Sequence, residues 1–398
     1  MLKILKQKVN LSWFVNPFYL YCIAFTLAIF VYLLGWSDLY PKLSLKLILF
    51  LVISFIPALL IGFYCQRKDI FFLENAEIPS FPNKVLFLII IILGAIDFLF
   101  GGKIPLFNRG LNYQEFGVDV IDPIFNTLCI FFSVFFFHTY LQRKERKLLF
   151  FIIIILSFQL LLYRRSTIVW IIISSTFLYL LYKKKMHLNK IILSAIFILM
   201  SAYIFGLFGN KRSNLDKSYA VNNLSASSEF KNSEINHNYY MTYLYISSPL
   251  ANLQLNIDSK ERLFEKGDFK SFIFYSLMPM SITFLLKDNL NLLPPNCKLI
   301  SPDLIVGTIF MTAFSSLGWT GMIIMALYMF VFIGACLLLV RKWNSFMLTT
   351  LSILSTTISL LIFSNFLDRL DVIMMLFIYP ILFHLIVILL HKKIYLFK

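Results

Sequence analysis

Residues 148–182 read LLFFIIIILSFQLLLYRRSTIVWIIISSTFLYLLY. Arg164 and Arg165 stand between two apolar runs of 16 and 17 residues, and no loop-forming residues surround them. A helix of 16 residues is about 24 Å long, somewhat less than the roughly 30 Å hydrocarbon core of a bilayer. The stretch therefore predicts two membrane-spanning helices joined by a turn. Both arginines lie in that turn, at a membrane interface or slightly below it.

The rest of the chain has the composition of a polytopic membrane protein. Of its 398 residues, 59% are hydrophobic and 14% are charged, and the mean hydropathy is +0.80. Backbone groups inside a bilayer must be paired internally, and the apolar runs lack the alternation of barrel strands, so we expect helices. About ten runs are apolar enough to span: 14–36, 44–64, 85–101, 123–141, 148–163, 166–182, 191–208, 317–340, 345–366 and 371–390.

Two further apolar pieces, 239–257 and 271–287, lie inside the long polar-rich stretch 209–316. They are interpreted as additional spans or as re-entrant or interfacial helices, and the pattern does not separate these alternatives. The fold we expect is an all-α polytopic integral membrane protein with about 10–12 transmembrane helices, organised as a single membrane domain over residues 1–398.

The distribution of charge indicates the orientation. One alternating set of loops holds 19 Lys or Arg residues, whereas the opposite short loops hold seven. Positive charge gathers on the cytoplasmic side, so both termini are predicted to be cytoplasmic. The net charge of +16 is then largely a topology signal, and we expect no nucleic-acid binding. The seven outward cations are Lys42, Lys46, Lys103, Arg109, Arg164, Arg165 and Arg369.

Two outward segments, 102–122 and 209–316, concentrate the candidate functional residues. The first reads GKIPLFNRGLNYQEFGVDVID. It offers Lys103 and Arg109 as cations, Tyr113 for stacking on a sugar, and Glu115 as a general base. An amphipathic loop lying on the membrane explains the same pattern.

The second segment adds a further outward basic pair, Lys211 and Arg212, in GNKRSN. Next come His237, a candidate base, and Tyr239 and Tyr240, which are either sugar contacts or part of an interfacial aromatic belt. Asp303 precedes a late span. Arg164 and Arg165 are interpreted either as anchors to lipid phosphates or as a recessed site for a phosphate or diphosphate, because a guanidinium fork suits that geometry.

Several motifs that would indicate other functions are missing. The sequence has no Walker A loop, no G-x-G-x-x-G after a strand, no H-E-x-x-H, no paired C-x-x-C and no D-x-D. We therefore do not expect an ATP-driven pump or a metal-bridged nucleotide-sugar donor. No metal site and no cofactor are predicted.

Four stretches resemble a known family when they are taken in order. They are GGKIPLFNRGLNYQEFG (101–117), LLYRRSTIVWIII (161–173), YLYISSPLANL (243–253) and VGTIFMTAFSSLGWTGM (306–322). Together with GNKRSN, this order resembles the O-antigen polymerases, the Wzy-type oligosaccharide repeat-unit polymerases. The Arg-to-Gly spacing that some members carry in two outward loops is absent here, so no residue role is transferred on that pattern.

The resemblance implies a GT-C-like glycosyltransferase of the bacterial inner membrane, with its active site facing the periplasm and with bilayer lipids around it. Its substrates would be two undecaprenyl-diphosphate-linked oligosaccharides, and its partners a chain-length regulator protein and a flippase. Under this hypothesis the diphosphates contact Arg164, Arg165, Lys211 and Arg212, and Lys103 and Arg109 also bind substrate. Glu115 is the first choice of base, before His237 and Asp303, and Tyr113, Tyr239 and Tyr240 contact sugars.

Two alternatives stay open. An O-antigen ligase shares the architecture and moves the glycan to a lipid A core. A lipid-linked oligosaccharide flippase is a transporter and would show repeated halves and short outward loops. The sequence shows no clear internal repeat and places its polar mass outward, so polymerase is the leading hypothesis.

Overall fold

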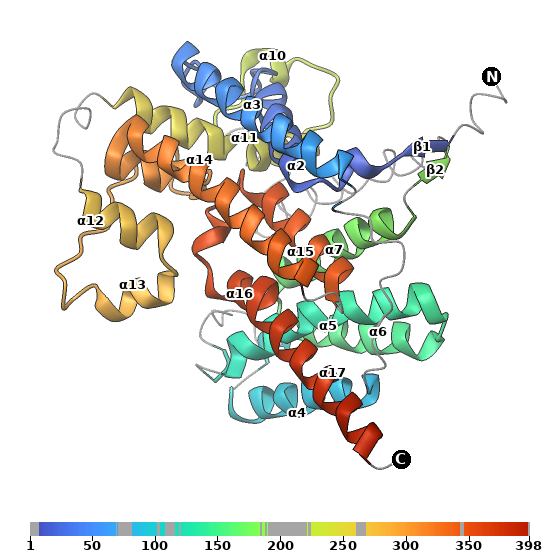
Figure 1. Cartoon of the computed structure of the whole chain (residues 1–398). Helices are drawn as coiled ribbons and strands as arrows, with labels where there is room; N and C mark the ends of the chain where they lie inside the picture. The colour runs from blue at the N-terminus through green and yellow to red at the C-terminus, as the bar shows by residue number, and fades with distance from the viewer. Residues whose placement is uncertain are drawn as a thin grey trace.

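The computed structural model of the chain is a helical bundle with one short strand pair (Figure 1). It describes residues 8–68, 70, 82–101, 104–107, 116–118, 121–183, 185–187, 189, 221, 224–259, 268–342 and 346–396. The first half contains β1 (Lys8–Asn10), η1 (Ser12–Phe14), α2 (Pro17–Tyr32), α3 (Leu45–Arg67), α4 (Asn83–Phe100), η2 (Pro105–Phe107), α5 (Ile121–Arg143), α6 (Arg146–Leu161), α7 (Arg165–Lys183) and β2 (Lys185–His187).

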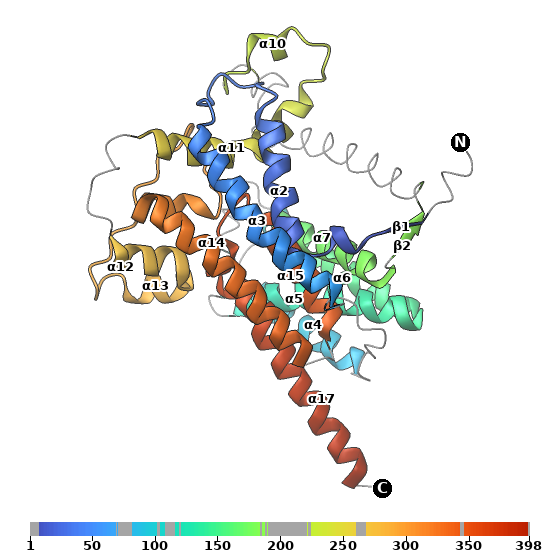
Figure 2. The same cartoon turned by 45° about the horizontal axis from the view of Figure 1, so that its top comes forward.

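The second half is also helical, and several of its helices are short or interrupted (Figure 2). Its elements are α10 (Ser228–Lys231), α11 (Asn238–Asp258), α12 (Phe269–Phe272), η4 (Ile273–Leu277), α13 (Met280–Leu286), α14 (Phe310–Lys342), α15 (Met347–Leu360), η6 (Phe366–Asp368), α16 (Leu370–Ile373), η7 (Met374–Ile378) and α17 (Tyr379–Leu396).

Six of the described helices are long and apolar enough to cross a bilayer, so the prediction of a polytopic α-helical membrane protein is confirmed at this level. The shorter apolar helices α2 and α15 occupy two more of the predicted runs, and α6 occupies another. The predicted run 191–208 lies outside the described residues. The six segments are Leu45–Arg67, Asn83–Phe100, Ile121–Arg143, Arg165–Lys183, Phe310–Lys342 and Leu370–Leu389.

Residues 239–257, for which the sequence left two alternatives open, form the long helix α11. This helix is buried and carries polar side chains. Asn252 has no exposed surface, and its Nδ2 donates to the carbonyls of Leu304 and Val306 at 2.6 and 2.8 Å. Its Oδ1 accepts from the Ile300 amide at 2.8 Å. Asn252 therefore provides hydrogen-bond partners for backbone groups of residues 300–306. This stretch precedes α14 and belongs to no helix or strand, so its backbone groups need such partners.

The second uncertain piece, 271–287, forms two short helical arms. α12 continues into η4, and α13 runs back beside it in both views (Figures 1 and 2). The first arm has nine residues, which as an α-helix is about 14 Å and is too short to cross a hydrocarbon core. The structure therefore favours the re-entrant or interfacial alternative for this piece.

The centre of the bundle contains α15, a helix rich in hydroxyl side chains. Ser352, Thr356 and Thr357 have no exposed surface, and each hydroxyl donates to a carbonyl of the preceding turn at 2.7 to 3.0 Å. Thr356 also bonds Ser174 of α7 at 2.9 Å. Because small hydroxyl residues let helix backbones approach closely while their polar atoms stay paired, this helix packs between its neighbours.

Loops that the charge pattern assigns to the same side meet one another. β1 and β2, both predicted to be cytoplasmic, pair antiparallel. At the opposite end, the Asp38 amide donates to the Ser225 carbonyl at 2.9 Å, and the Ser44 amide donates to Gln254 Oε1 at 2.9 Å. These contacts agree with the predicted alternation of the loops.

Helix α14 is interrupted near its N-terminal end. Gly318 has φ 62° and ψ −143°, a conformation that side chains other than glycine rarely adopt. A Cβ at Gly321 would overlap the carbonyl oxygen of Ala313, so the two pieces also pack closely across the break. The interruption sets the direction of Trp319, which follows it directly.

Replacing Asn252 tests the pairing role of α11. Asn252→Leu leaves two carbonyls and one amide of 300–306 without their side-chain partners, so we expect a loss of about 3 kcal/mol in stability. Asn289→Leu, the same change at an exposed position, is the control and should shift stability by less than about 0.5 kcal/mol. Thermal denaturation of the purified protein in detergent measures both, and equal midpoints would contradict the assignment.

Candidate functional site

The turn between α6 and α7 has the geometry of a Schellman helix end. The Arg164 amide donates to the Gln159 carbonyl at 2.9 Å, and the Tyr163 amide donates to the Leu160 carbonyl at 3.0 Å. Tyr163 takes the left-handed position with φ 60°, where glycine is the usual residue. The two helices can therefore turn back within a few residues, and the arginine pair falls where α7 begins.

The two arginines have different surroundings. The side chain of Arg164 is only 10% exposed, and its Nη2 forms an ion pair with Asp122 Oδ1 in the first turn of α5. Arg165 is exposed, and its guanidinium lies over the Tyr163 ring, 4.7 Å from the centroid. Arg164 therefore faces the bundle and Arg165 faces outward, which sequence reasoning had left open.

A second carboxylate joins the ion pair from α4. Asp97 has no exposed surface, and its Oδ1 accepts the amide of Val118 at 3.0 Å. Its carboxyl group also interacts with that of Asp122. Two carboxyl groups and one guanidinium are neutral together only when the carboxyl pair holds one proton. The cluster Asp97–Asp122–Arg164 thus joins α4, α5 and the α6–α7 turn at one end of the bundle.

Two glycines pack closely beside this cluster. Gly117 has φ 115°, and a Cβ there would lie 2.8 Å from Asp122 Cγ. A Cβ on Gly101 would lie 3.0 Å from the Gly117 backbone. Only glycine allows this approach, so Gly117 lies directly against Asp122, and the end of α4 at Gly101 lies against Gly117.

Two buried polar atoms of the cluster lack a hydrogen-bond partner within the described ranges. They are Asp97 Oδ2 and Arg164 Nη1. Beside the cluster, the fully buried side chain of Gln159 in α6 interacts with the Cys129 thiol. Buried polar groups are nearly always paired with protein, water or a ligand. The cluster consequently has free hydrogen-bonding capacity for a polar ligand or for water at this end of the bundle.

A second buried carboxyl lies at the turn between α15 and α16. Asp368 is 4% exposed, and its Oδ2 accepts Asn365 Nδ2 at 3.0 Å, while Oδ1 has no partner in the described part of the chain. The same Asn365 nitrogen donates to the Ser276 carbonyl of η4 at 2.8 Å. This contact ties the short helical arm α12–η4 to the bundle.

Burial raises the pKa of Asp368 to about 7. Its charged neighbours act in opposite directions, because Arg369 lowers the pKa and Asp371 raises it. Arg369 instead pairs with Asp371 at 2.6 Å. Among the described residues of this turn, the ion pair therefore joins Arg369 to Asp371 and leaves Asp368 out.

The other predicted site residues lie elsewhere or outside the description. His237 and Asp303 are exposed, and Tyr239 is partly buried. Tyr240 is fully buried, donates to the Leu224 carbonyl at 2.7 Å and stacks on Phe230, so its ring packs within the protein. Six candidates lie outside the described residues: Lys103, Arg109, Tyr113, Glu115, Lys211 and Arg212.

Sequence reasoning missed Asp122 and Gln159. Asp122 reads as the polar end of a loop, and Gln159 as a lone amide in an apolar run. A polar amide inside an otherwise apolar run at membrane depth was the available signal for Gln159. Among the described residues, no three His, Cys, Asp or Glu side chains are grouped closely enough to hold a metal ion.

Comparison of the chain with family models, curated proteins and solved structures gave no match.

Replacing the two arginines separately tests whether Arg164 stabilises the fold and Arg165 does not. Arg164→Ala leaves the buried Asp97 and the partly buried Asp122 without their cation, so we expect a loss of about 3 kcal/mol. Arg165→Ala is the matched neighbour and should change stability by less than about 0.5 kcal/mol. Thermal denaturation in detergent separates them. A double variant with Arg164→Leu and Asp122→Leu should recover part of the loss, and equal destabilisation by the two single alanine variants would contradict the assignment.

The pKa of Asp368 predicts a pH dependence of stability. The folded pKa is raised above the unfolded value, so the native state binds the extra proton, and the stabilisation is lost as pH rises through about 7. The full effect is on the order of 4 kcal/mol. The denaturation midpoint of the wild type should therefore fall from about pH 4 to pH 7 more steeply than that of Asp368→Asn. Parallel curves would show that Asp368 does not carry this dependence.

Proposed function

We propose that this protein is a membrane-embedded glycosyltransferase that polymerises lipid-linked glycan units, as O-antigen polymerases do. The observation that carries the proposal is the arginine turn. It combines an exposed cation, Arg165, with a buried cluster that has unpaired hydrogen-bonding groups. Ionisable residues near membrane depth are by default functional candidates. A lipid diphosphate with attached sugars meets such a surface with its charged group at the interface and its hydroxyls nearby.

The proposed reaction needs no energy source beyond its donor. The bond between the anomeric carbon and the diphosphate oxygen of the growing chain breaks, and the hydroxyl oxygen of the new unit bonds to that carbon. The hydroxyl proton passes to a protein base, and polyprenyl diphosphate leaves with the bonding electrons. Because negative charge develops on the leaving oxygen, a cation at this point lowers the barrier.

Arg165 is the residue we assign to the diphosphate. Its guanidinium is exposed and rests on Tyr163, which leaves its nitrogen donors free to point outward. Arg164 has Asp122 as its counter-ion, so much of its charge is already neutralised. Its role in the proposal is to hold the turn and the carboxyl pair in position.

The base is proposed to come from the carboxyl groups around the same turn. The carboxyl groups of Asp97 and Asp122 interact there, and the Asp122 side chain is 23% exposed, so Asp122 is the member of the pair that a substrate can reach. Glu115 precedes Phe116, which is buried against Phe98 next to the cluster. Among the described residues, His237 and Asp303 have no contact with this turn, so we rank them below these carboxyls as candidates for the base.

The setting of the proposed enzyme follows from topology. We propose a GT-C-like protein of the bacterial inner membrane, with cytoplasmic termini and the arginine turn facing the periplasm. The excess of Lys and Arg in one set of loops supports this orientation. The proposed substrates are undecaprenyl-diphosphate-linked oligosaccharides, and a flippase and a chain-length regulator are the proposed partners. A ligase would use the same donor with a different acceptor.

One observation favours a second candidate, a transporter. His138 of α5 is almost fully buried, its Nδ1 is 3.4 Å from the Thr349 hydroxyl, and its Nε2 has no partner in the described ranges. Histidines inside membrane proteins mark proton or substrate pathways. A lipid-linked oligosaccharide flippase would use such a path.

Deleting the gene and separating the surface polysaccharide on a gel tests the proposal. A polymerase predicts lipid cores capped with a single repeat unit and no ladder of longer chains. Complementation with Arg165→Ala should give shorter chains or none, with unchanged protein level, whereas Lys231→Ala removes another exposed cation and should restore the full ladder.

Loss of every capped core after deletion would overturn the polymerase reading and leave a ligase or a flippase. A full ladder from Arg165→Ala would remove Arg165 from the diphosphate site. The deletion tests the polymerase function, and the Arg165→Ala variant tests the diphosphate site, so each result bears on its own claim.

A further inference from the structure

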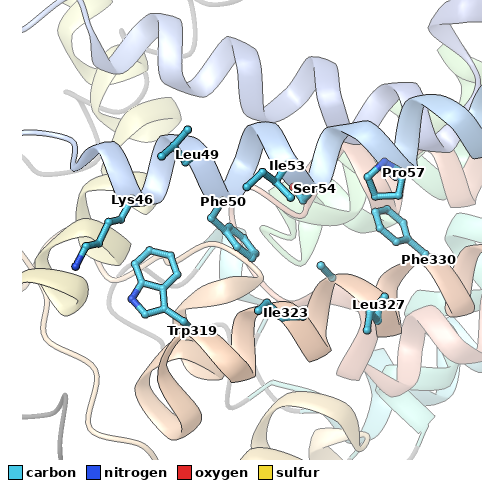
Figure 3. A pocket seen from close by; sticks show the side chains of 11 residues that line it. Lys46, Leu49, Phe50, Ile53, Ser54, Pro57, Trp319, Ile323, Leu327 and Phe330 are labelled. Atoms are coloured by element: carbon cyan, nitrogen blue, oxygen red, sulfur yellow. The ribbon is translucent and has the colours of Figure 1, made fainter.

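A groove of about 670 Å³ lies between α3 and α14 (Figure 3). Both helices are among the segments able to cross a bilayer. The lining residues of α3 extend from Lys46 to Pro57, and those of α14 from Trp319 to Phe330. Each stretch covers eleven residue steps, or about 16 Å of helix. The groove therefore follows the membrane-spanning direction over about half of a hydrocarbon core.

Away from its Lys46 end, the wall of the groove is apolar. Leu49, Ile53 and Leu327 are exposed along it. The hydroxyl of Ser54 is already bonded, to Tyr21 at 2.7 Å and to the Leu51 carbonyl at 2.7 Å. This apolar part of the groove favours a hydrocarbon chain over a sugar or water.

One end of the groove differs from the rest. Lys46 and Trp319 lie together there (Figure 3). Lys46 is the one charged residue among the described lining residues, and it has no ion-pair partner within the described ranges. Trp319 follows the break at Gly318, and its ring lies 6.0 Å from that of Phe50. The charge pattern assigns this end to the outer interface, where Lys and Trp both favour the headgroup level.

We infer that the groove binds the prenyl chain of a polyprenyl phosphate or diphosphate, with the phosphate at Lys46. The cation at one end complements an anionic headgroup, and the apolar length below it complements a hydrocarbon tail. A single groove fits one chain, whereas a bilayer phospholipid carries two. The inference rests on the proposed function, which needs two lipid-linked substrates: Arg165 is assigned to the diphosphate of one, and this groove to the prenyl chain and phosphate of the other.

Labelling of the purified full-length protein tests the groove. A polyprenyl phosphate with a photoreactive group in its chain is mixed with the protein in detergent, and the labelled residues are mapped by mass spectrometry. Labels should fall on the two lining stretches, Lys46–Pro57 of α3 and Trp319–Phe330 of α14. A diacyl phosphatidylglycerol with the same reactive group is the comparison lipid, and it should label these residues several-fold less.

Two substitutions and two matched controls complete the test. Leu327→Trp fills the groove, while Leu338→Trp places the same ring at an exposed site of α14 that does not line it. Lys46→Gln removes the cation, and Lys42→Gln removes a neighbouring exposed one. Leu327→Trp should abolish labelling, and Lys46→Gln should weaken binding about fivefold, as expected for one ion pair of about 1 kcal/mol.

Equal labelling by the phospholipid, labels outside α3 and α14, or no response to Leu327→Trp would each overturn the inference. The test is independent of polymer formation. If the prenyl lipid labels the groove while gene deletion leaves the polysaccharide ladder intact, the groove stands and the proposed function fails. If deletion removes the ladder and no label appears, the function stands and the groove inference fails.

Discussion

The ion pair between Arg164 and Asp122 is the contact on which the functional end of this protein depends. It joins the α6–α7 turn to the start of α5, and Asp97 brings α4 to the same point. Charges buried in a bundle of helices are costly unless they are paired. The pairing therefore fixes the arrangement of four helix ends, and Gly101 and Gly117 pack closely beside it.

This arrangement gives the two adjacent arginines separate tasks. Arg164 forms an ion pair with Asp122 and so holds the carboxyl pair. Arg165 faces the interface, and its guanidinium lies over the Tyr163 ring. The groove between α3 and α14 lies on another part of the bundle and has its own cation, Lys46. The proposed reaction uses two lipid-linked substrates, and the two features, each with its own cation, are assigned to different ones.

Hydropathy and charge were enough to predict the helical membrane fold and most helix positions, because the apolar runs are long and the loops are strongly asymmetric in charge. The same patterns located the α6–α7 turn. They did not separate Arg164 from Arg165, because that depends on Asp122 and Asp97 arriving from distant segments. Tyr240 looked available to a sugar, yet tertiary packing on Phe230 buries it. Periodicity also missed the interruptions in 271–287 and at Gly318, since both lie within apolar runs.

Reconstituted transfer tests the central claim most directly. The purified protein is placed in liposomes with a polyprenyl-diphosphate-linked oligosaccharide as the sole substrate, and the products are weighed by mass spectrometry. The account predicts lipid-linked glycans of two and more repeat units, together with released polyprenyl diphosphate in equal number to the new linkages. Recovery of only the single starting unit, from protein that remains folded, would contradict it.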